Sequence, residues 1–283
     1  MMRLKNFSGR WLAVMVAAVG TSTLSAVSAS PMLLVDYKAA NYNATNGVWT
    51  DSSVNGNNAA VPVGVTAPTL TANATPNGSS AVSFVTMNSG EYLNIATGLT
   101  PGSGYTVLAF AEPTEAVYLD DNLVGGASGA LAYRIGPTAG SNHQLLGNDS
   151  TTLGSSNTGV PTTAFSMIGV ATDNAGNATF YFNGNADGTI TANDPFTSPI
   201  NLIGARHSPA TGFFIGNVAE LQIYSGVLTA GAVQTVNQAF ISSYVNPVPE
   251  PTTVGLLAVA GAGMALRRKR RSGAARVGGG RGQ

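Results

Sequence analysis

Short runs of β-branched and aromatic residues recur along the middle of this sequence, and stretches rich in Gly, Asn, Thr and Ser separate them. Such runs between turn-forming residues are typical of short strands in an all-β domain. Thirty-five of the 283 residues are glycine, which supplies the backbone freedom that many tight turns need. The pattern predicts strands at residues 32–37, 81–85, 92–95, 105–112, 130–135, 165–172, 178–183, 200–205 and 216–224.

The segment TVLAFAEP at residues 106–113 predicts a strand that is buried on both faces. Val107 and Ala109 alternate with Leu108 and Phe110, so both faces of this strand are apolar. A strand that is buried on one face alone alternates between apolar and polar residues. We therefore expect a layer of structure on each side of it.

One helix is expected near the end of the domain, at residues 229–244. Val233, Val236, Phe240 and Ile241 recur there at the spacing of a single helical face. This apolar stripe predicts a helix that packs against the sheets.

The turns and loops follow from Gly, Asn and Pro. Asn-Gly at residues 183–184 and Asp-Gly at residues 187–188 predict tight turns between strands. Residues 41–80 contain fewer apolar residues and more Asn, Gly and Pro, which favours long loops over a second domain.

Charge is distributed unevenly along the chain. Residues 31–246 hold twelve acidic residues against three basic ones, Lys38, Arg134 and Arg206, and the remaining basic residues lie near the two ends. An acidic middle repels phosphate backbones, so we do not expect it to bind nucleic acid. The sequence has no cysteine, which excludes disulfides, thiolate metal sites and a cysteine nucleophile.

The N-terminus has the composition of a secretory signal peptide over residues 1–29. Three basic residues precede an apolar run at residues 11–19, and small residues then lead to a suitable cleavage site just before Ser30. Export is therefore expected. The core of the mature chain must hold the fold without disulfides, and about 215 residues are enough for one sizeable core.

Residues 165–244 resemble the second half of a laminin-G-like, concanavalin-A-like jelly-roll domain. In that family, one strand leads by a short turn to a second strand that ends in an Asn-Gly or Asp-Gly hairpin, matched here by residues 165–172 and by Asn183-Gly184. A strand that ends in Ile-Gly follows, matched by Ile203-Gly204. The pattern Gly-x-(Ile/Val)-x-(Glu/Asp)-x-x-(Ile/Val)-Tyr comes next, matched by GNVAELQIY at residues 216–224. The resemblance implies an all-β jelly-roll sandwich over residues 30–245 with one short C-terminal helix. It implies little about activity, because this scaffold carries many unrelated functions.

The stretch at residues 246–271 combines three features in a fixed order. A Val-Pro-Glu-Pro motif comes first, then fifteen uncharged residues at 252–266, and then a basic block made of Arg267, Arg268, Lys269, Arg270 and Arg271. The apolar run predicts one transmembrane helix at about residues 251–267, and the basic block is expected to stop transfer and stay cytoplasmic. Residues 272–283 are expected to form a disordered tail.

This C-terminal stretch resembles the PEP-CTERM sorting signal of Gram-negative bacteria, whose core motif matches Val248, Pro249, Glu250 and Pro251. The resemblance implies a precursor anchored in the inner membrane and recognised by a processing enzyme of the exosortase type. It further implies removal of the anchor and delivery to the cell surface or extracellular matrix. The twelve residues after the basic block depart from the family, whose members usually end there.

The sequence carries no recognisable catalytic motif. The glucanases of this fold place carboxylates along one strand as Glu-x-Asp-x-x-Glu, and no such run occurs. Glu220 stands alone among apolar neighbours, which favours a structural carboxylate near a sheet edge. His143 and His207 lack the spacing of zinc ligands and are expected to be solvated loop residues. Serine-hydrolase, P-loop and dinucleotide-binding motifs do not occur either.

Calcium is the one cofactor that the resemblance suggests, because domains of this family often bind Ca²⁺ through loop oxygens. The oxygen-rich segments LDDNLVGG and ATDNAGN offer Asp120, Asp121 and Asp173 as ligands. Asp and Asn also crowd ordinary turns for conformational reasons, so a plain turn is the alternative.

Two classes of function remain open. One is an exported, non-catalytic binding or structural protein of the envelope or matrix, which contacts polysaccharide or a surface protein. The other is an exported glycoside hydrolase or other saccharide-acting enzyme. The small number of acidic residues and the missing catalytic run favour the first. Carbohydrate sites on β-sandwiches usually stack an aromatic ring on the sugar. The candidate ligand-binding residues are therefore Trp49, Tyr118, Tyr133 and Phe213. Each of them could equally belong to the core.

Overall fold

The computed structural model describes residues 30–85, 90–100, 102–114, 121–126, 132–135, 142–146, 152–191, 198–206 and 212–247. Within these ranges the chain forms two antiparallel sheets, a short 3-10 turn and one α-helix. The elements are β1 (Met32–Lys38), η1 (Ala39–Asn41), β2 (Tyr42–Asn43), β3 (Val48–Trp49), β4 (Ala59–Ala60), β5 (Thr69–Thr71), β6 (Ala81–Phe84), β7 (Leu93–Leu99), β8 (Gly104–Pro113), β9 (Asp121–Gly126), β10 (Ala132–Ile135), β11 (Asn142–Leu146), β12 (Thr152–Gly159), β13 (Ser166–Asp173), β14 (Asn177–Phe182), β15 (Asn185–Thr191), β16 (Ile200–Ile203), β17 (Gly216–Ser225) and α1 (Ala230–Tyr244).

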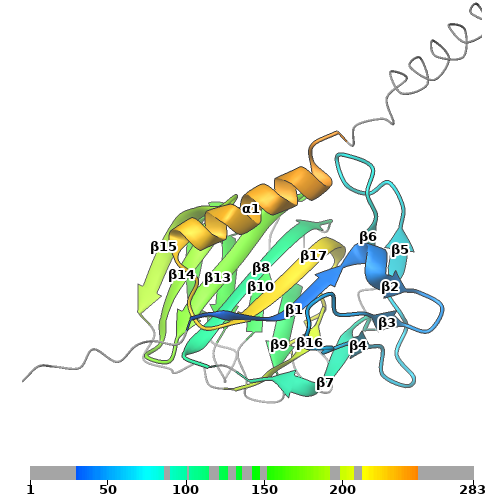
Figure 1. The fold of residues 1–283 in the computed structure, drawn as a ribbon, viewed down its shortest axis with the longest axis horizontal. Coiled ribbons are helices and arrows are strands. Elements are labelled where there is room, and N and C mark those ends of the chain that lie inside the picture. The colour runs from blue at the N-terminus through cyan, green and yellow to red at the C-terminus, as the bar shows by residue number, and fades with distance from the viewer. Residues whose placement is uncertain are drawn as a thin grey trace, which may run out of the picture.

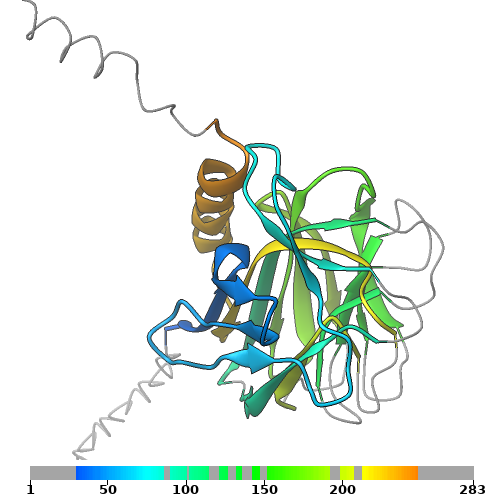
Figure 2. The same cartoon turned by 90° about the vertical axis from the view of Figure 1, so that its right-hand side faces the viewer.

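The two sheets face each other as a sandwich (Figure 1). Sheet A has the strand order β15-β14-β13-β8-β17-β6-β5, and β1 also pairs with β17. Sheet B has the order β12-β11-β10-β9-β16-β7-β4-β3-β2. Helix α1 lies outside the sandwich, against the outer face of sheet A (Figures 1 and 2). The outer face of sheet B has no helix over it among the described residues.

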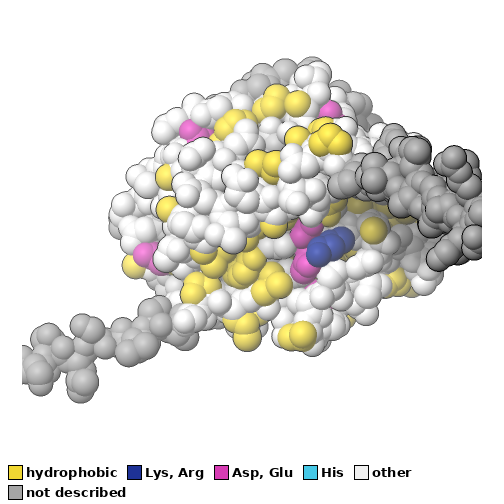
Figure 3. Space-filling model, turned by 45° about the horizontal axis from the view of Figure 1, so that its top comes forward, with side chains coloured by type: hydrophobic (Ala, Val, Ile, Leu, Met, Phe, Trp, Pro, Cys, Tyr) yellow, Lys and Arg dark blue, Asp and Glu magenta, His cyan; other side chains and the backbone are white. Residues whose placement is uncertain are grey.

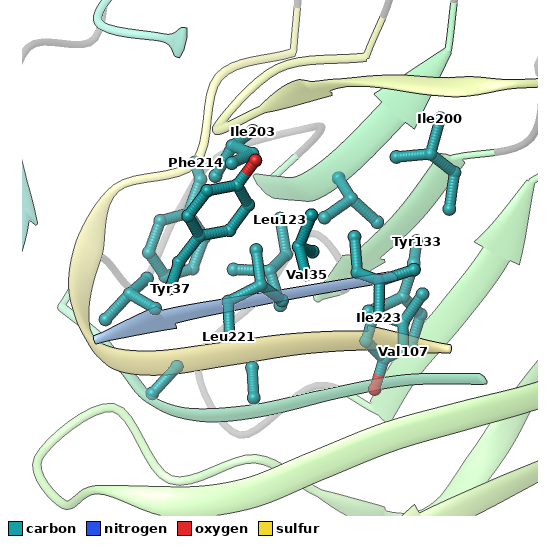
Figure 4. Packing of buried hydrophobic residues seen from close by; sticks show 14 of the residues in the cluster. Val35, Tyr37, Val107, Leu123, Tyr133, Ile200, Ile203, Phe214, Leu221 and Ile223 are labelled. Atoms are coloured by element: carbon teal, nitrogen blue, oxygen red, sulfur yellow. The ribbon is translucent and has the colours of Figure 1, made fainter. Parts of the chain in front are cut away.

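The main core fills the space between the sheets. Val35, Val107, Leu221 and Ile223 from sheet A meet residues of sheet B such as Leu123 (Figure 4). A second apolar cluster fills the space between sheet A and α1, where Leu108 and Phe110 pack against helix residues. Strand β8 is therefore buried on both faces, as its sequence predicts. One apolar cluster covers each face.

A β-bulge in β17 changes the direction of one carboxylate. Val218 and Leu221 both point into the main core although strict alternation would place them on opposite faces. The register with β8 shifts between Val218 and Glu220, so one extra residue is inserted there. Because of this bulge, Glu220 lies on the face covered by α1, where it accepts a hydrogen bond from Tyr244.

The nine predicted strands and the predicted helix are all present, with bounds that differ by a few residues. Thr229 caps the helix by accepting a hydrogen bond from the Ala232 N–H at 3.3 Å. The turn at Asn183 and Gly184 is confirmed, since φ is +47° and +81° at these residues.

Residues 41–80 are mostly irregular, as expected, but they also contain the short strands β2 to β5. Two other expectations about local structure were wrong. Strands β9, β11, β12 and β15 were not predicted, because their polar and Gly-rich sequences show no clear alternation. Asp187 and Gly188 lie inside β15 rather than in a turn.

Within the described residues, no helix combines the length and the apolar character needed to cross a bilayer. The predicted signal peptide at 1–29, the predicted span at 251–267 and the predicted tail at 272–283 lie outside these residues.

The fold predicts a strong asymmetry between two charge substitutions. Ile223 is completely buried in the main core, whereas Val63 is fully exposed. Ile223→Asp buries an unpaired carboxylate and is expected to cost more than about 4 kcal/mol of unfolding free energy, which is close to the whole stability of many domains. Val63→Asp is expected to change it by less than about 0.5 kcal/mol. Urea unfolding of both variants measures the difference, and equal stability of the two would contradict the sandwich assignment.

Candidate functional site

Two aromatic rings lie together on the outer face of sheet B. Tyr92 precedes β7, and Phe213 lies in the segment that leads into β17. Their ring centroids are 6.3 Å apart and the ring planes differ by 27°, so the rings are stacked. Both side chains are partly exposed. They form a continuous aromatic surface that a ligand can reach.

Local backbone features hold Phe213 in this place. Asn122 of β9 donates a hydrogen bond from Nδ2 to the Gly212 carbonyl at 2.8 Å. The next residue, Phe214, points inward and packs against Phe84 at 5.8 Å in the core. Gly90 has φ of +65°, and a Cβ atom there would lie 2.5 Å from the Phe213 ring. A glycine is therefore required beneath the ring.

A hollow of about 270 Å³ adjoins Tyr92. Its lining includes Asn94 of β7 and Asn201 of β16, together with Pro62 and Leu202. The side chains of Leu93 and Ile203 on the same two strands point into the core. Oδ1 of Asn201 is buried and has no hydrogen-bond partner among the described residues. The hollow thus places two carboxamide side chains beside an aromatic face.

This arrangement suits a neutral ligand that has both a flat apolar face and hydroxyl groups. An aromatic ring packs against such a face, and a carboxamide both donates and accepts hydrogen bonds. The lining of the hollow contains no charged side chain. An ion would find no countercharge there.

Two of the predicted ligand-binding aromatics are core residues instead. Trp49 is completely buried, packs against Tyr37 at 5.5 Å and donates a hydrogen bond from Nε1 to the Lys38 carbonyl at 2.8 Å. Tyr133 is also completely buried. A ligand cannot reach either ring, because the sandwich core surrounds both. Tyr118 lies outside the described residues. Of the four candidates, Phe213 is the one described at the surface.

His143 is buried in β11 rather than solvated in a loop, which corrects that expectation; His207 lies outside the described residues. The Tyr133 hydroxyl is hydrogen-bonded to Nδ1 of His143. Burial raises the pKa of Tyr133 well above its ordinary value, so the hydroxyl is the donor and Nε2 carries the imidazole proton. Nε2 lies 3.9 Å from Oδ2 of Asp187. Burial lowers the pKa of His143 to about 4 despite the attraction of Asp187, so the ring is neutral at pH 7.

Glu220 is neither alone nor near a sheet edge, because β17 is an interior strand of sheet A. It accepts hydrogen bonds from Gln222 at 2.6 Å and from Tyr244 at 2.7 Å, and it also contacts the carboxyl group of Asp36. Asp36 forms an ion pair with Lys38 at 3.3 Å. Figure 3 shows a basic side chain flanked by acidic ones on the face that carries α1.

The surroundings of Glu220 favour its protonated form. The pKa of Glu220 is raised to about 7, chiefly by burial; the hydrogen bond from Tyr244 lowers it, and the neighbouring Asp36 raises it. Near neutral pH, Glu220 therefore holds a proton more readily than an exposed glutamate does.

The structure describes little of the predicted calcium ligands. Asp120 and the side chain of Asp121 lie outside the described residues. Asp173 caps the turn between β13 and β14, where Oδ1 accepts from the N–H groups of Ala175 at 2.9 Å and Asn177 at 2.8 Å. No group of three His, Asp or Glu side chains in the described part of the chain is close enough to hold a metal ion. A calcium site at Asp120, Asp121 and Asp173 stays a prediction.

Residues 87–234, just over half of the chain, match the family model described as the concanavalin A-like lectin/glucanase superfamily, of laminin-G type. This chain belongs to that superfamily. Residues 247–271 match the PEP-CTERM protein-sorting motif, which confirms the resemblance of the C-terminal stretch. The motif indicates an exported protein that is sorted by exosortase to the cell surface. No curated protein sequence matches the chain.

Solved structures of low sequence identity share the fold. Domain 4 of AbnA, an extracellular arabinanase from Geobacillus stearothermophilus solved in complex with arabinotriose, is 19% identical with a TM-score of 0.52, and the match covers 74% of this chain and 99% of that domain. The ligand-binding domain of botulinum neurotoxin serotype D, solved with N-acetylneuraminic acid, is 11% identical with a TM-score of 0.53 over 76% of this chain. The binding domain of Paraclostridial Mosquitocidal Protein 1 is 13% identical with a TM-score of 0.53 over 74% of this chain. This chain spans about half of each of those two toxin chains, 54% and 52% respectively.

Glu220 and His143 predict opposite pH dependences of stability. The pKa of Glu220 is raised on folding from 4.5 to about 7, so the native state binds the proton first and acidification from pH 7 stabilises it. The pKa of His143 is lowered on folding from 6.5 to about 4, so the unfolded state binds the proton first and acidification destabilises the fold. In the native sequence the two effects oppose each other between pH 6.5 and 4.5.

Single substitutions separate these effects. Glu220→Gln removes the stabilisation that protonation of Glu220 provides and leaves the destabilising effect of His143 unopposed. Between pH 7 and 5, the unfolding free energy of this variant is therefore expected to fall by roughly 2 kcal/mol more than that of the native protein. His143→Asn removes the destabilising effect of His143. On acidification from pH 7 to 5, the unfolding free energy of this variant is therefore expected to rise relative to that of the native protein. Urea unfolding at pH 5, 6 and 7 measures both, and each variant serves as the control for the other. Parallel pH profiles in the two variants would contradict the assignment.

Proposed function

We propose that the protein is an exported, non-catalytic surface protein that binds a neutral polysaccharide through the outer face of sheet B. The observation that carries the proposal is the stacked pair of Tyr92 and Phe213 beside the hollow lined by Asn94 and Asn201. Aromatic stacking and carboxamide hydrogen bonds are the usual means by which proteins hold sugar rings.

The related solved structures support the choice of ligand. Two of them were solved with saccharide ligands, and one of these ligands, arabinotriose, is uncharged. The uncharged hollow of this chain fits a neutral saccharide better than an acidic one. Sorting to the cell surface would bring the domain into contact with extracellular polysaccharide.

The alternative of a glycoside hydrolase is less well supported. Glycosidases that use two carboxyl groups hold them about 5 Å apart or more, so that a nucleophile or a water molecule can act between them and the sugar. Asp36 and Glu220 are both buried, at 8% and 4% exposed, so a sugar has no access to the space between them. The pair also lies beneath the end of α1, on the side of the sandwich away from the aromatic surface. We therefore assign it a structural role.

We further propose the organisation of the precursor. Residues 1–29 are a signal peptide, residues 30–245 one folded domain, residues 246–271 the sorting and anchor segment and residues 272–283 a tail. Helix α1 ends at Tyr244, so the sorting motif at Val248 follows the domain almost directly.

Saccharide binding is expected to depend on the aromatic pair. Tyr92→Ala and Phe213→Ala each remove a stacking surface and are expected to weaken binding of a neutral oligosaccharide such as arabinotriose by roughly 5- to 30-fold, which is about 1–2 kcal/mol. Tyr92→Phe keeps the ring and is expected to retain most of the affinity. Leu70→Ala, an exposed apolar position on sheet A, serves as a distant control.

Isothermal titration with arabinotriose, xylotriose and cellotriose measures this dependence. No binding of any of these sugars to the native protein, or equal binding by Tyr92→Ala, would contradict the proposed site. Release of new reducing ends from the sugars would instead support the hydrolase.

Processing of the tail gives a separate prediction. In the native cell the wild-type protein is expected to lose its C-terminal segment and to fractionate outside the inner membrane. A variant with Pro249, Glu250 and Pro251 changed to alanine is expected to keep the segment and stay in the inner membrane. Intact mass and cell fractionation of the two proteins measure this, and an uncut tail in both would restrict the protein to a membrane-anchored form.

A further inference from the structure

A second hollow, of about 400 Å³, lies between the N-terminal half of α1 and the β14–β15 hairpin. Its lining is unusual in chemistry, because five carboxamides and one hydroxyl account for almost all of it: Asn183, Asn185, Gln234, Thr235, Asn237 and Gln238. The volume lies in the range of small-ligand sites. The lining contains no charged side chain.

The floor of this amide-lined hollow is built rather than accidental. Asn237 is 6% exposed and donates a hydrogen bond from Nδ2 to the Asn183 carbonyl at 3.2 Å. Oδ1 of Asn183 accepts from the Met167 N–H at 3.1 Å, which fixes that side chain to β13. Gly184 has φ of +81°, and a Cβ there would lie 2.9 Å from the Asn237 side chain. The hairpin therefore contacts the helix closely at a glycine.

The walls carry hydrogen-bonding groups that the protein itself leaves unused. Gln234 and Gln238 are exposed and lie one helical turn apart, so they share one face of α1. Within the described part of the chain, neither of these two amides makes a hydrogen bond, and Oδ1 of Asn237 has no donor. Each free amide group can both donate and accept. Together they offer a dense set of hydrogen-bonding groups without charge.

The two hollows lie on opposite sides of the sandwich. Helix α1 covers the outer face of sheet A, whereas Asn94 and Asn201 lie on the outer face of sheet B. Figure 1 shows α1 and β7 at opposite sides of the molecule. A ligand in one hollow therefore leaves the other free.

We infer that the amide-lined hollow is a second saccharide-binding site, so that one molecule can bridge two neutral polysaccharide chains. The inference rests on the proposed function of the Tyr92 site and extends it from binding to cross-linking. Paired amide donors and acceptors match the hydroxyl groups of a neutral sugar, and the absence of charge in the lining disfavours ionic ligands. A peptide partner would in addition require an apolar pocket for its side chains, which this lining does not provide.

The test is a count of sites in the full-length protein, purified in detergent. Titration with arabinotriose, xylotriose and cellotriose is expected to give two equivalents of one of these sugars in the native protein. The double variant Gln234→Ala, Gln238→Ala is expected to weaken one equivalent at least about tenfold and to leave the other unchanged. Tyr92→Ala is expected to weaken the complementary equivalent. Ser242→Ala, on an exposed part of α1 outside the hollow, is the matched control.

These substitutions are expected to leave folding unchanged, because Gln234 and Gln238 are exposed and alanine favours helix. Cross-linking gives a second readout. The native protein is expected to raise the light scattering of a soluble neutral polysaccharide built from whichever of the three sugars binds, and each single-site variant is expected to bind that polymer without raising it.

The outcomes separate this inference from the proposed function. One equivalent that is lost in Tyr92→Ala but not in the glutamine double variant overturns the second site and leaves the first. No binding of any of the three sugars overturns both. One equivalent that is lost only in the double variant overturns the Tyr92 site and the bridging. Two equivalents without increased scattering also overturn the bridging.

Discussion

The antiparallel pairing between β17 and β8 is the contact on which the rest of the sandwich depends. Strand β17 pairs with β8 from Gly216 to Ser225, and its other edge is shared by β6 and β1. One strand thus joins the beginning, the middle and the end of the domain. Buried backbone groups need hydrogen-bond partners, so removing β17 would leave β1 without a partner strand and would expose one edge each of β8 and β6. Because β8 is apolar on both faces, the same pairing also requires the core between the sheets and α1 outside them.

This arrangement divides the chemistry of the molecule between two faces. The bulge in β17 directs Glu220 beneath the end of α1, where Asp36 lies beside it and Tyr244 donates a hydrogen bond to it. The titratable pair is therefore part of the packing of the helix. Sheet B has no helix over its outer face in the described residues, and there Tyr92 and Phe213 lie beside uncharged amides. The buried pair of Asp36 and Glu220 lies on the side of α1, whereas exposed aromatic rings and uncharged amides lie on the other side.

The aromatic candidates show how much of a ligand-binding site can be predicted from local sequence patterns. Phe213 and Phe214 are adjacent and chemically identical, yet one stacks on Tyr92 and the other is in the core. Trp49 was predicted to bind a sugar ring, but it is buried in the core. Tyr92 was missed, although alternation carried a usable signal: it shares a strand face with Asn94, opposite Leu93. The face of a strand can be predicted from alternation, but which face becomes the core depends on the packing of the sheets.

The sequence alone determined the properties that local patterns encode. It determined the sandwich class, the strand that is apolar on both faces, the C-terminal helix and the sorting motif, because each depends on periodicity or on a short run of adjacent residues. The tertiary structure decided which distant residues meet. Asn94 and Asn201 share a hollow only because β7 pairs with β16, and Glu220 meets Asp36 and Tyr244 only because one extra residue in β17 changes its face. Periodicity specifies the direction of a side chain relative to its own strand, whereas its neighbours are set by strand order and register, which no local pattern contains.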